Sequence, residues 1–324
     1  RGKAMNQLKE IASQLLRYNY LVLAGHAIPD GDCIGSMLGL QSALQTLGKK
    51  VEMILEDPVP AIYHYLPNWE GIKPPVVTEQ QGFAAVYLDC SDQCRVSDEV
   101  RQVLQNALVT INIDHHLGNS LFGDYNYVNP EAAATAEIIY ELLHIMQAPI
   151  TEDVANCLYA GIIMDTGRFM NSNTTSLTMK IASELLKKGA SVDLARNNLF
   201  ESKPLPEILL LKHALGHLTL SEDGKIASMW LTLEEVKQAG AMHYHPEGII
   251  NYTRMIAGVE VGLLFREVDI DQVKVGFRSR GTVDVASLAR EFGGGGHRLA
   301  AGASFKGKLE SVMEKVLARV KDVC

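Results

Sequence analysis

Residues 21–32 read LVLAGHAIPDGD, and this stretch decides how the chain begins to fold. The apolar run 21–24 has the length and character of a buried strand. It is followed at once by one imidazole and two carboxylates, those of His26, Asp30 and Asp32. A packed core does not require such a concentration of polar ligands. The segment therefore predicts a strand that ends in a metal site.

Other apolar runs end in residues of the same kind. They are 84–88 before Asp89, 109–113 before Asp114, His115 and His116, and 160–164 before Asp165. Because the carboxyl ends of parallel strands open into one crevice, we expect these side chains to converge there. The sequence thus predicts a single centre built from aspartates and histidines of four segments.

The ligand types indicate which metal this centre would hold. Carboxylates with some imidazole suit Mn²⁺, or Mg²⁺ at lower affinity, whereas a structural zinc site would normally use thiolates. Five carboxylates around one ion would carry too much negative charge, so we expect two ions that share a bridging carboxylate. The structural alternative is that each aspartate caps a helix and each histidine fills a half-buried slot. Capping needs only one polar residue per loop, so it does not account for the whole set.

Composition limits the class of substrate. The 324 residues are 47% hydrophobic and 21% charged with a formal net charge of -8, which is ordinary for two globular domains and offers no broad basic surface. We therefore expect a short or small phosphorylated substrate and no long duplex nucleic acid. No apolar run approaches the roughly 20 residues of a membrane span, and no signal peptide is recognised. Five cysteines, with Cys33 and Cys90 next to proposed ligands, favour a reducing compartment. We expect a cytoplasmic monomer or homodimer without membrane partners.

The order of elements predicts two domains. Strands at 21–25, 51–55, 84–88 and 109–113 alternate with helices such as 33–47 and 98–107, and helices follow at 131–147, 152–164 and 175–188. Such alternation is typical of an α/β domain with a parallel sheet covered on both faces, here 1–188. A helical linker is expected at 189–222. A smaller α+β domain is expected at 223–324, with strands at 225–231, 259–268 and 272–279 and helices near 284–291 and 308–321.

The second domain contains a candidate phosphate site. Gly293, Gly294, Gly295, Gly296 and His297 follow one another in a run. Glycines let main-chain N–H groups approach an anion closely, because no Cβ keeps the ligand away. By itself this run would indicate a flexible loop with a solvated histidine. The segment Arg278, Ser279 and Arg280 at the end of a predicted strand favours phosphate or nucleotide binding, since arginine can grip a phosphate with two parallel hydrogen bonds.

These motifs resemble those of the DHH phosphoesterase superfamily, named for the triplet at 114–116. The glycine run with its histidine is similar to the signature of the DHH-associated C-terminal domain. In length and layout the chain is similar to the oligoribonucleases that also dephosphorylate 3′-phosphoadenosine 5′-phosphate (pAp), the nanoRNase group. The resemblance covers nearly the whole chain. It implies a parallel-sheet catalytic domain with a smaller α+β domain across a cleft.

The resemblance also implies roles for individual residues. One Mn²⁺ would be held by His26, Asp30 and Asp89, and a second by Asp32, Asp89, His115 and Asp165, with Mg²⁺ or Co²⁺ as substitutes. His116 would face the scissile phosphate or assist the leaving group, and Asp114 would orient the histidine pair. Arg278, Ser279 and the run Gly294, Gly295, Gly296 and His297 would hold the rest of the nucleotide.

The implied activity is hydrolysis of short oligoribonucleotides to mononucleotides and removal of the 3′-phosphate of pAp. A phosphodiesterase for cyclic dinucleotides or linear pApA remains an alternative, because such substrates differ little from a diribonucleotide. Family II inorganic pyrophosphatases share the N-terminal motifs but present a Ser-Arg-Lys signature in place of the glycine run. RecJ-like exonucleases carry further DNA-binding modules. A catalytically silent nucleotide-binding module is disfavoured because no metal ligand is missing.

Overall fold

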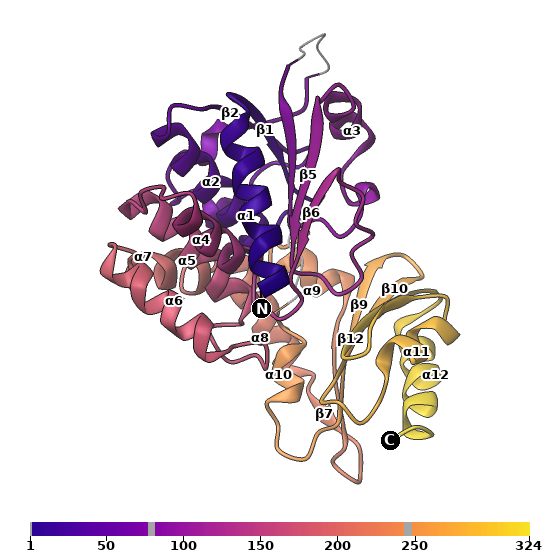
Figure 1. Cartoon of the computed structure of the whole chain (residues 1–324). Coiled ribbons are helices and arrows are strands. Elements are labelled where there is room, and N and C mark those ends of the chain that lie inside the picture. Colours follow the sequence, from indigo (N-terminus) through magenta and orange to yellow (C-terminus); the bar gives the residue numbers. More distant parts are fainter. Residues whose placement is uncertain (1, 77–81, 243–247) are drawn as a thin grey trace. The chain divides into compact units, whose positions relative to one another are not determined.

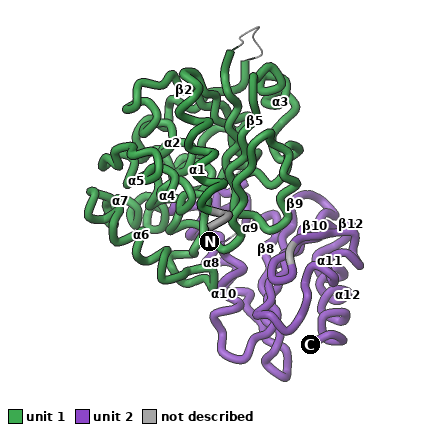
Figure 2. Tube along the Cα trace, in the orientation of Figure 1, with its two compact units in different colours: residues 1–202 green, residues 203–324 purple. Residues whose placement is uncertain are grey.

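The computed structural model describes residues 2–76, 82–242 and 248–324. Its internal contacts divide the chain into two units, Arg1–Ser202 and Lys203–Cys324 (Figures 1 and 2). The division falls inside the segment expected as a linker, which contains α7 (Val192–Ala195), the π-helix Arg196–Phe200 and α8 (Leu205–Gly216). Among the described residues, no helix combines the length and the apolar character that crossing a membrane requires.

The first unit is built on a parallel sheet. Its strands are β1 (Tyr20–Ala24), β2 (Lys50–Ile54), β3 (Ile72–Lys73), β4 (Ala84–Leu88), β5 (Val109–Asp114) and β6 (Tyr125–Val128). Their order is β3-β2-β1-β4-β5-β6, and every neighbouring pair is parallel. The chain adds strands on one side of β1 and then, from β4, on the other. Open α/β sheets bind ligands at such a switch point, just beyond the carboxyl ends of the strands.

Helices cover both faces of this sheet, as predicted (Figure 1). One face packs against α1 (Gly2–Arg17), α2 (Gly31–Thr46), α4 (Thr135–Ile145), α5 (Glu152–Asp165) and α6 (Ser176–Lys187). The other face packs against α3 (Asp98–Leu104) and against Val96, which follows the short turn Gln93–Arg95. Alternation along β1 explains the arrangement, because Leu21 and Leu23 face the first group of helices while Val22 and Ala24 face the second. Short 3₁₀ turns at Ala61–Tyr63 and Trp69–Gly71 lie between β2 and β3.

Two glycines allow α2 and α5 to approach closely. A Cβ on Gly35 would lie 2.3 Å from the carbonyl oxygen of Cys157, and a Cβ on Gly161 would lie 3.0 Å from Oδ1 of Asp32. Neither distance leaves room for a side chain. Asp165 follows Gly161 by one helical turn. The close contact of the two helices therefore brings Asp32 and Asp165 to the same end of the sheet.

The second unit contains a mixed sheet. Its strands are β7 (Thr219–Leu220), β8 (Ile226–Leu231), β9 (Val261–Asp269), β10 (Gln272–Ser279), β11 (Gly295–His297) and β12 (Ala300–Lys306), in the order β11-β12-β10-β9-β8-β7. Only β8 and β9 pair in parallel. One face packs against α11 (Val285–Glu291) and α12 (Leu309–Lys321), and the other against α8 and α9 (Leu233–Gln238). The short helix α10 (Asn251–Arg254) precedes β9.

Candidate metal centre

His26 and Asp30 lie in the loop between β1 and α2. Asp30 is the N-cap of α2, since its Oδ1 accepts hydrogen bonds from two backbone N–H groups of the first turn. Asp30 therefore does cap a helix, which was the alternative to a role as a metal ligand. Its Oδ1 nevertheless also lies 3.8 Å from Nε2 of His26. The other ring nitrogen of His26, Nδ1, donates to the carbonyl oxygen of Ala27 at 2.8 Å. Metal-binding histidines typically donate one ring N–H to an oxygen in this way, which leaves Nε2 as the ligand atom.

Asp32 lies in the first turn of α2 and is fully buried. Its Oδ2 accepts a hydrogen bond from the backbone N–H of Thr135 at 2.5 Å, and its Oδ1 accepts from that of Ala136 at 2.8 Å and from Oγ of Ser36 at 3.2 Å. Asp32 therefore also caps α4, from more than one hundred residues away, and the positive end of that helix stabilises its charge. A carboxylate oxygen has two lone pairs, and Oδ2 uses one of them for the bond to Thr135, so Oδ2 can still face a cation.

Asp89 follows β4 and lies between two histidines. The residue adopts a left-handed backbone with φ 59°, and it is 2% exposed. Its Oδ2 lies 3.5 Å from Nε2 of His26, and its Oδ1 lies 3.5 Å from Nε2 of His115. Oδ1 also accepts a hydrogen bond from Oγ1 of Thr135 at 3.0 Å. The two oxygens of one carboxylate thus face two different sets of ligands.

Asp165 completes the second of these sets. Its Oδ2 lies 3.2 Å from Nε2 of His115, which is also 3.8 Å from Oδ2 of Asp32. Nδ1 of His115 lies within hydrogen-bond distance of the Ala132 carbonyl, at 3.3 Å, so Nε2 again remains as the ligand atom. Asp165 is the last residue of α5, so this ligand is supplied by a helix, as expected for 152–164, and not by a strand of the sheet. The negative end of a helix disfavours a carboxylate, which gives Asp165 a further reason to need a cation nearby.

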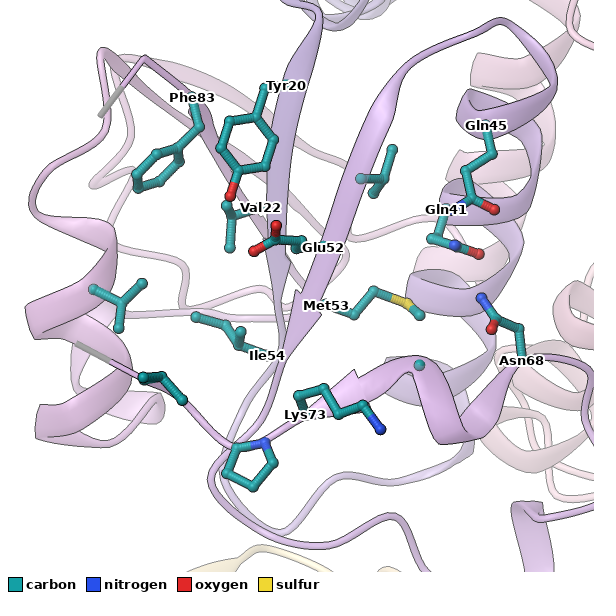
Figure 3. Close-up of a pocket in the computed structure, with 15 residues that line it drawn as sticks. Tyr20, Val22, Gln41, Gln45, Glu52, Met53, Ile54, Asn68, Lys73 and Phe83 are labelled. Carbon is teal, nitrogen blue, oxygen red and sulfur yellow. The ribbon is translucent and has the colours of Figure 1, made fainter. Parts of the chain in front are cut away.

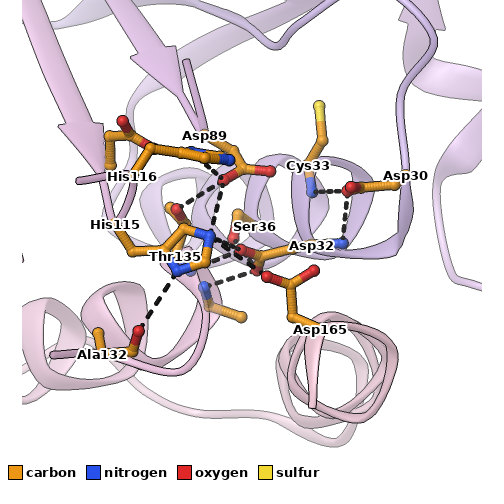
Figure 4. Close-up of polar contacts among 12 residues, drawn as sticks. Asp30, Asp32, Cys33, Ser36, Asp89, His115, His116, Ala132, Thr135 and Asp165 are labelled. Atoms are coloured by element: carbon orange, nitrogen blue, oxygen red, sulfur yellow. Dashed lines mark hydrogen bonds and ion pairs between the residues drawn. The ribbon is translucent and has the colours of Figure 1, made fainter. Parts of the chain in front are cut away.

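The structure brings all six predicted metal ligands together. Figure 4 labels five of them, namely Asp30, Asp32, Asp89, His115 and Asp165. Among the described residues, ligand atoms approach one another within 4.8 Å in three sets, namely His26 with Asp30 and Asp89, Asp32 with His115 and Asp165, and Asp89 with His115 and His116. The first set contains the three residues expected around one ion, and the second contains three of the four expected around the other, without Asp89. The assignment of each residue to an ion stays a prediction.

The electrostatics of the centre favour bound cations. Burial, and then the charges of Asp89 and Asp165, raise the pKa of Asp32 well above its ordinary value. Burial would lower the pKa of His26, but hydrogen bonds to Asp30 and Asp89 raise it to about 10. Burial would also lower the pKa of His115, but the hydrogen bond to Asp165 and the charges of Asp32 and Asp89 raise it to about 10. Buried carboxylates at this density repel one another unless positive charge lies between them. The donor set therefore fits divalent cations.

Asp114 and His116 form a separate hydrogen-bonded unit at the end of β5. Asp114 is fully buried, and its Oδ1 accepts a hydrogen bond from Nδ1 of His116 at 2.7 Å. Its Oδ2 accepts from Nδ2 of Asn119 at 2.6 Å. The bond to Asp114 raises the pKa of His116. Because the side chain of His116 is 43% exposed, its Nε2 remains available to a substrate.

Sequence reasoning missed three side chains that support these ligands. Thr135 is fully buried and bonds Asp89, as described above. Asn119 joins Asp114 to the carbonyl oxygen of Cys90, 3.1 Å from its Nδ2. Asn173 donates from Nδ2 to the carbonyl oxygens of Asp165 at 3.2 Å and Ala133 at 3.1 Å. Only Asn119 had a sequence signal, because it follows the DHH triplet by three residues.

Arg278 and Ser279 end β10 in the second unit. Ser279 is 1% exposed, and its Oγ accepts a hydrogen bond from the N–H of Gly281 at 2.9 Å, while its own N–H donates to the carbonyl oxygen of Leu299 at 3.0 Å. Nη1 of Arg278 donates to the carbonyl oxygen of Phe277 at 3.0 Å. The serine therefore stabilises the turn after β10. Contact of either side chain with a substrate stays a prediction.

Part of the glycine run is a strand and not a flexible loop, which was the alternative to a phosphate site. Residues Gly295–His297 form β11 and pair with β12. A Cβ on Gly294 would lie 2.1 Å from the carbonyl oxygen of Gly302, and one on Gly296, whose φ is 141°, would lie 2.6 Å from that of Ala300. Both glycines are thus required by close strand pairing. Gly293 and Gly295 face open space on their Cβ sides, and the side chain of His297 lies outside the described part of the structure.

A pocket of about 330 Å³ lies elsewhere in the first unit, beside β2 and β3 (Figure 3). Gln41, Gln45, Met53 and Asn68 are among the residues that line it. None of the predicted metal ligands lines this pocket. The chemistry of the chain is therefore expected at the switch point between β1 and β4 and not in this pocket.

Comparison with known proteins agrees with this arrangement. Residues 21–162 match the N-terminal domain of the DHH family, and residues 245–324 match the DHHA1 domain. A relative from Thermus thermophilus, named bifunctional oligoribonuclease and PAP phosphatase NrnA, is 34% identical over 93% of this chain and 89% of its own length.

Two solved structures show the same fold. An exopolyphosphatase-related protein from Bacteroides fragilis superimposes with a TM-score of 0.89 at 28% identity, over 98% of this chain and 97% of its own. Exonuclease RecJ bound to manganese superimposes with a TM-score of 0.52 at 16% identity, over 97% of this chain and 93% of its own, which shows likeness of fold alone. The resemblance noted in the motifs is confirmed: the chain belongs to the DHH family of phosphoesterases, and it carries a DHHA1 domain after the DHH domain.

Proposed function

We propose that this protein hydrolyses short oligoribonucleotides to mononucleotides and removes the 3′-phosphate of pAp. The observation that carries the proposal is the convergence of four carboxylates and two imidazoles at the switch point of the parallel sheet. The name of the Thermus thermophilus relative supports the choice of substrates, because the similarity extends over nearly the whole of both chains.

We propose two Mn²⁺ ions as the cofactor, with Mg²⁺ or Co²⁺ as substitutes. His26, Asp30 and Asp89 would hold one ion, and Asp32, Asp89, His115 and Asp165 the other. The division of Asp89 supports its role as the bridge, since Oδ2 faces His26 and Oδ1 faces His115, each at 3.5 Å. When bound, two such cations acidify water and neutralise charge on phosphate oxygens.

Asp114 and His116 of the DHH triplet would supply the proton that the leaving group needs. Asp114 accepts from Nδ1 of His116, which fixes the ring and leaves Nε2 directed away from Asp114. The raised pKa of His116 favours the protonated ring near neutral pH. Hydrolysis breaks one P–O bond, and the departing ribose oxygen needs a proton, which Nε2 of His116 would supply. No nucleophilic side chain is needed.

Surface charge, buried thiols and the second unit bear on which substrates are bound and where the protein acts. The substrate is bound without a broad basic surface, so we infer that binding of long duplexes is weak. Cys33 and Cys90 are buried free thiols next to the ligands, which supports a reducing compartment such as the cytoplasm. We infer a monomer or homodimer, with Arg278, Ser279 and the segment from Gly294 to His297 holding the distal part of the nucleotide.

Release of mononucleotide from a labelled diribonucleotide with Mn²⁺ tests the proposal, run beside pAp, pyrophosphate and c-di-AMP. We expect turnover of the diribonucleotide and of pAp, loss of turnover in Asp89→Ala, and mainly weaker substrate binding in His297→Ala. Faster hydrolysis of c-di-AMP or pyrophosphate than of either expected substrate would replace the proposal with one of its alternatives.

A further inference from the structure

The three most exposed large apolar side chains of the described residues all lie in loops that carry a proposed metal ligand or directly follow one. Leu117 is 89% exposed, Met170 is 85% exposed and Ile28 is 84% exposed. Scattered apolar side chains are normal on protein surfaces, but their concentration beside one centre is not expected by chance. We name these three side chains the apolar rim.

The rim residues lie within reach of the centre. Ile28 is two residues from both His26 and Asp30, so its Cα lies within about 7 Å of theirs. Leu117 directly follows His116. Met170 follows Asp165 by five residues, and its N–H donates to the carbonyl oxygen of Thr166 at 3.0 Å, which keeps the turn compact.

The rim is held outward by an ordered backbone. Ile28 adopts φ 56°, a left-handed conformation that a β-branched residue rarely takes, and its N–H donates to Oδ2 of Asp57 at 2.7 Å. The turn before Met170 contains two further left-handed residues, Arg168 and Phe169, at φ 64° and 63°. Beyond Leu117, the N–H of Ser120 donates to the carbonyl oxygen of Ser91 at 2.8 Å. Backbone strain that persists beside a functional site is commonly part of its function.

We infer that the apolar rim binds the nucleobase next to the scissile phosphate, an inference that rests on the proposed function. In a nucleotide a single ribose separates the base from the phosphate, so a phosphate at the metal centre places a base near these loops. The flat faces of a base are apolar, whereas its edges carry hydrogen-bonding groups. Aliphatic side chains therefore cover a face of any base without reading its edge. The rim would make the enzyme select nucleotides over base-free phosphates with little preference among bases.

A matched pair of substrates tests this inference. One is pAp, and the other is 1-deoxyribose 3,5-bisphosphate, which has the same phosphates and no base. The variant combines Ile28→Asn, Leu117→Ala and Met170→Ala, with asparagine at position 28 because it tolerates a left-handed backbone. The control is Leu108→Ala, which shortens a 65% exposed side chain just before β5. Leu108 lies at the amino end of that strand, whereas the proposed ligands lie beyond the carboxyl ends of the strands.

The measured quantity is the ratio of kcat/KM for pAp to that for the base-free compound. We expect the wild-type protein and Leu108→Ala to share a high ratio, and the triple variant to lower it by about tenfold or more, the scale of one or two apolar contacts. Diribonucleotides of different bases should differ little with the wild-type protein.

Two results would overturn the inference. One is a wild-type ratio near one. The other is a triple variant whose ratio stays within twofold of wild type, including the case in which both activities fall equally because the rim instead contacts another part of the chain. A wild-type protein that hydrolyses neither pAp nor a diribonucleotide would refute the proposed function itself. The two failures are therefore distinguishable.

Discussion

Replacing Thr135 by valine would test how the fold supports the proposed bridging carboxylate. The substitution nearly preserves volume at a fully buried position and removes the hydrogen bond from Oγ1 to Oδ1 of Asp89, 3.0 Å long. A hydrogen bond to a charged group contributes about 1.5–3 kcal/mol. If that bond holds Asp89 in place for the cations, its loss should weaken Mn²⁺ binding about 10- to 100-fold, as found when residues that orient metal ligands are changed.

The assay is calorimetric titration of the metal-free protein with Mn²⁺, together with the Mn²⁺ dependence of diribonucleotide cleavage. Thr253→Val is the matched control, because Thr253 is also fully buried and its Oγ1 donates to the carbonyl oxygen of Ile250, in the second unit. We expect Thr253→Val to keep the wild-type affinity for Mn²⁺. An unchanged Kd for Mn²⁺ in Thr135→Val would refute the reasoning.

Three further predictions concern neighbouring positions. Gly35→Ala forces α2 and α5 apart. We therefore expect it to lower the free energy of unfolding by about 1–3 kcal/mol in urea titrations and to reduce activity. The control Gly216→Ala places a Cβ in open space and should not reduce activity. Asn119→Leu removes a hydrogen bond that holds Asp114 and should lower kcat at least tenfold with little change in KM; a change confined to KM would contradict this. Asp114→Asn replaces the carboxylate that raises the pKa of His116 by a neutral amide, so the alkaline limb of the kcat–pH profile should move to lower pH, and a limb that stays in place would show that it belongs to another group.

Local patterns in the sequence predicted the central part of the fold well. Each of the four strands expected in the first unit lies within one residue of its expected start and end, because buried parallel strands appear as short continuous apolar runs. The short strands β3 and β6 were not predicted, since two and four residues leave no periodicity to detect. In the second unit, no strand was expected in the glycine run, whereas its last residues pair with β12.

The sequence revealed the metal ligands because their side chains are chemically distinctive. It did not reveal the side chains that hold these ligands in place. Asp165 was expected just after the apolar run 160–164 and the helix at 152–164, and it is the last residue of that helix, α5. Thr135 has no signal in the sequence, because its contact with Asp89 joins residues 46 positions apart. Asp32 similarly caps α4 through contacts that span 103 and 104 positions. Such roles exist only once the chain has folded.

The most direct test of a two-cation centre bridged by Asp89 is anomalous diffraction from crystals soaked in Mn²⁺. The account predicts two anomalous peaks beyond the carboxyl ends of β1 and β4, one beside His26 and the other beside His115, with the carboxylate of Asp89 between them. A single peak, or peaks that do not contact Asp89, would contradict it.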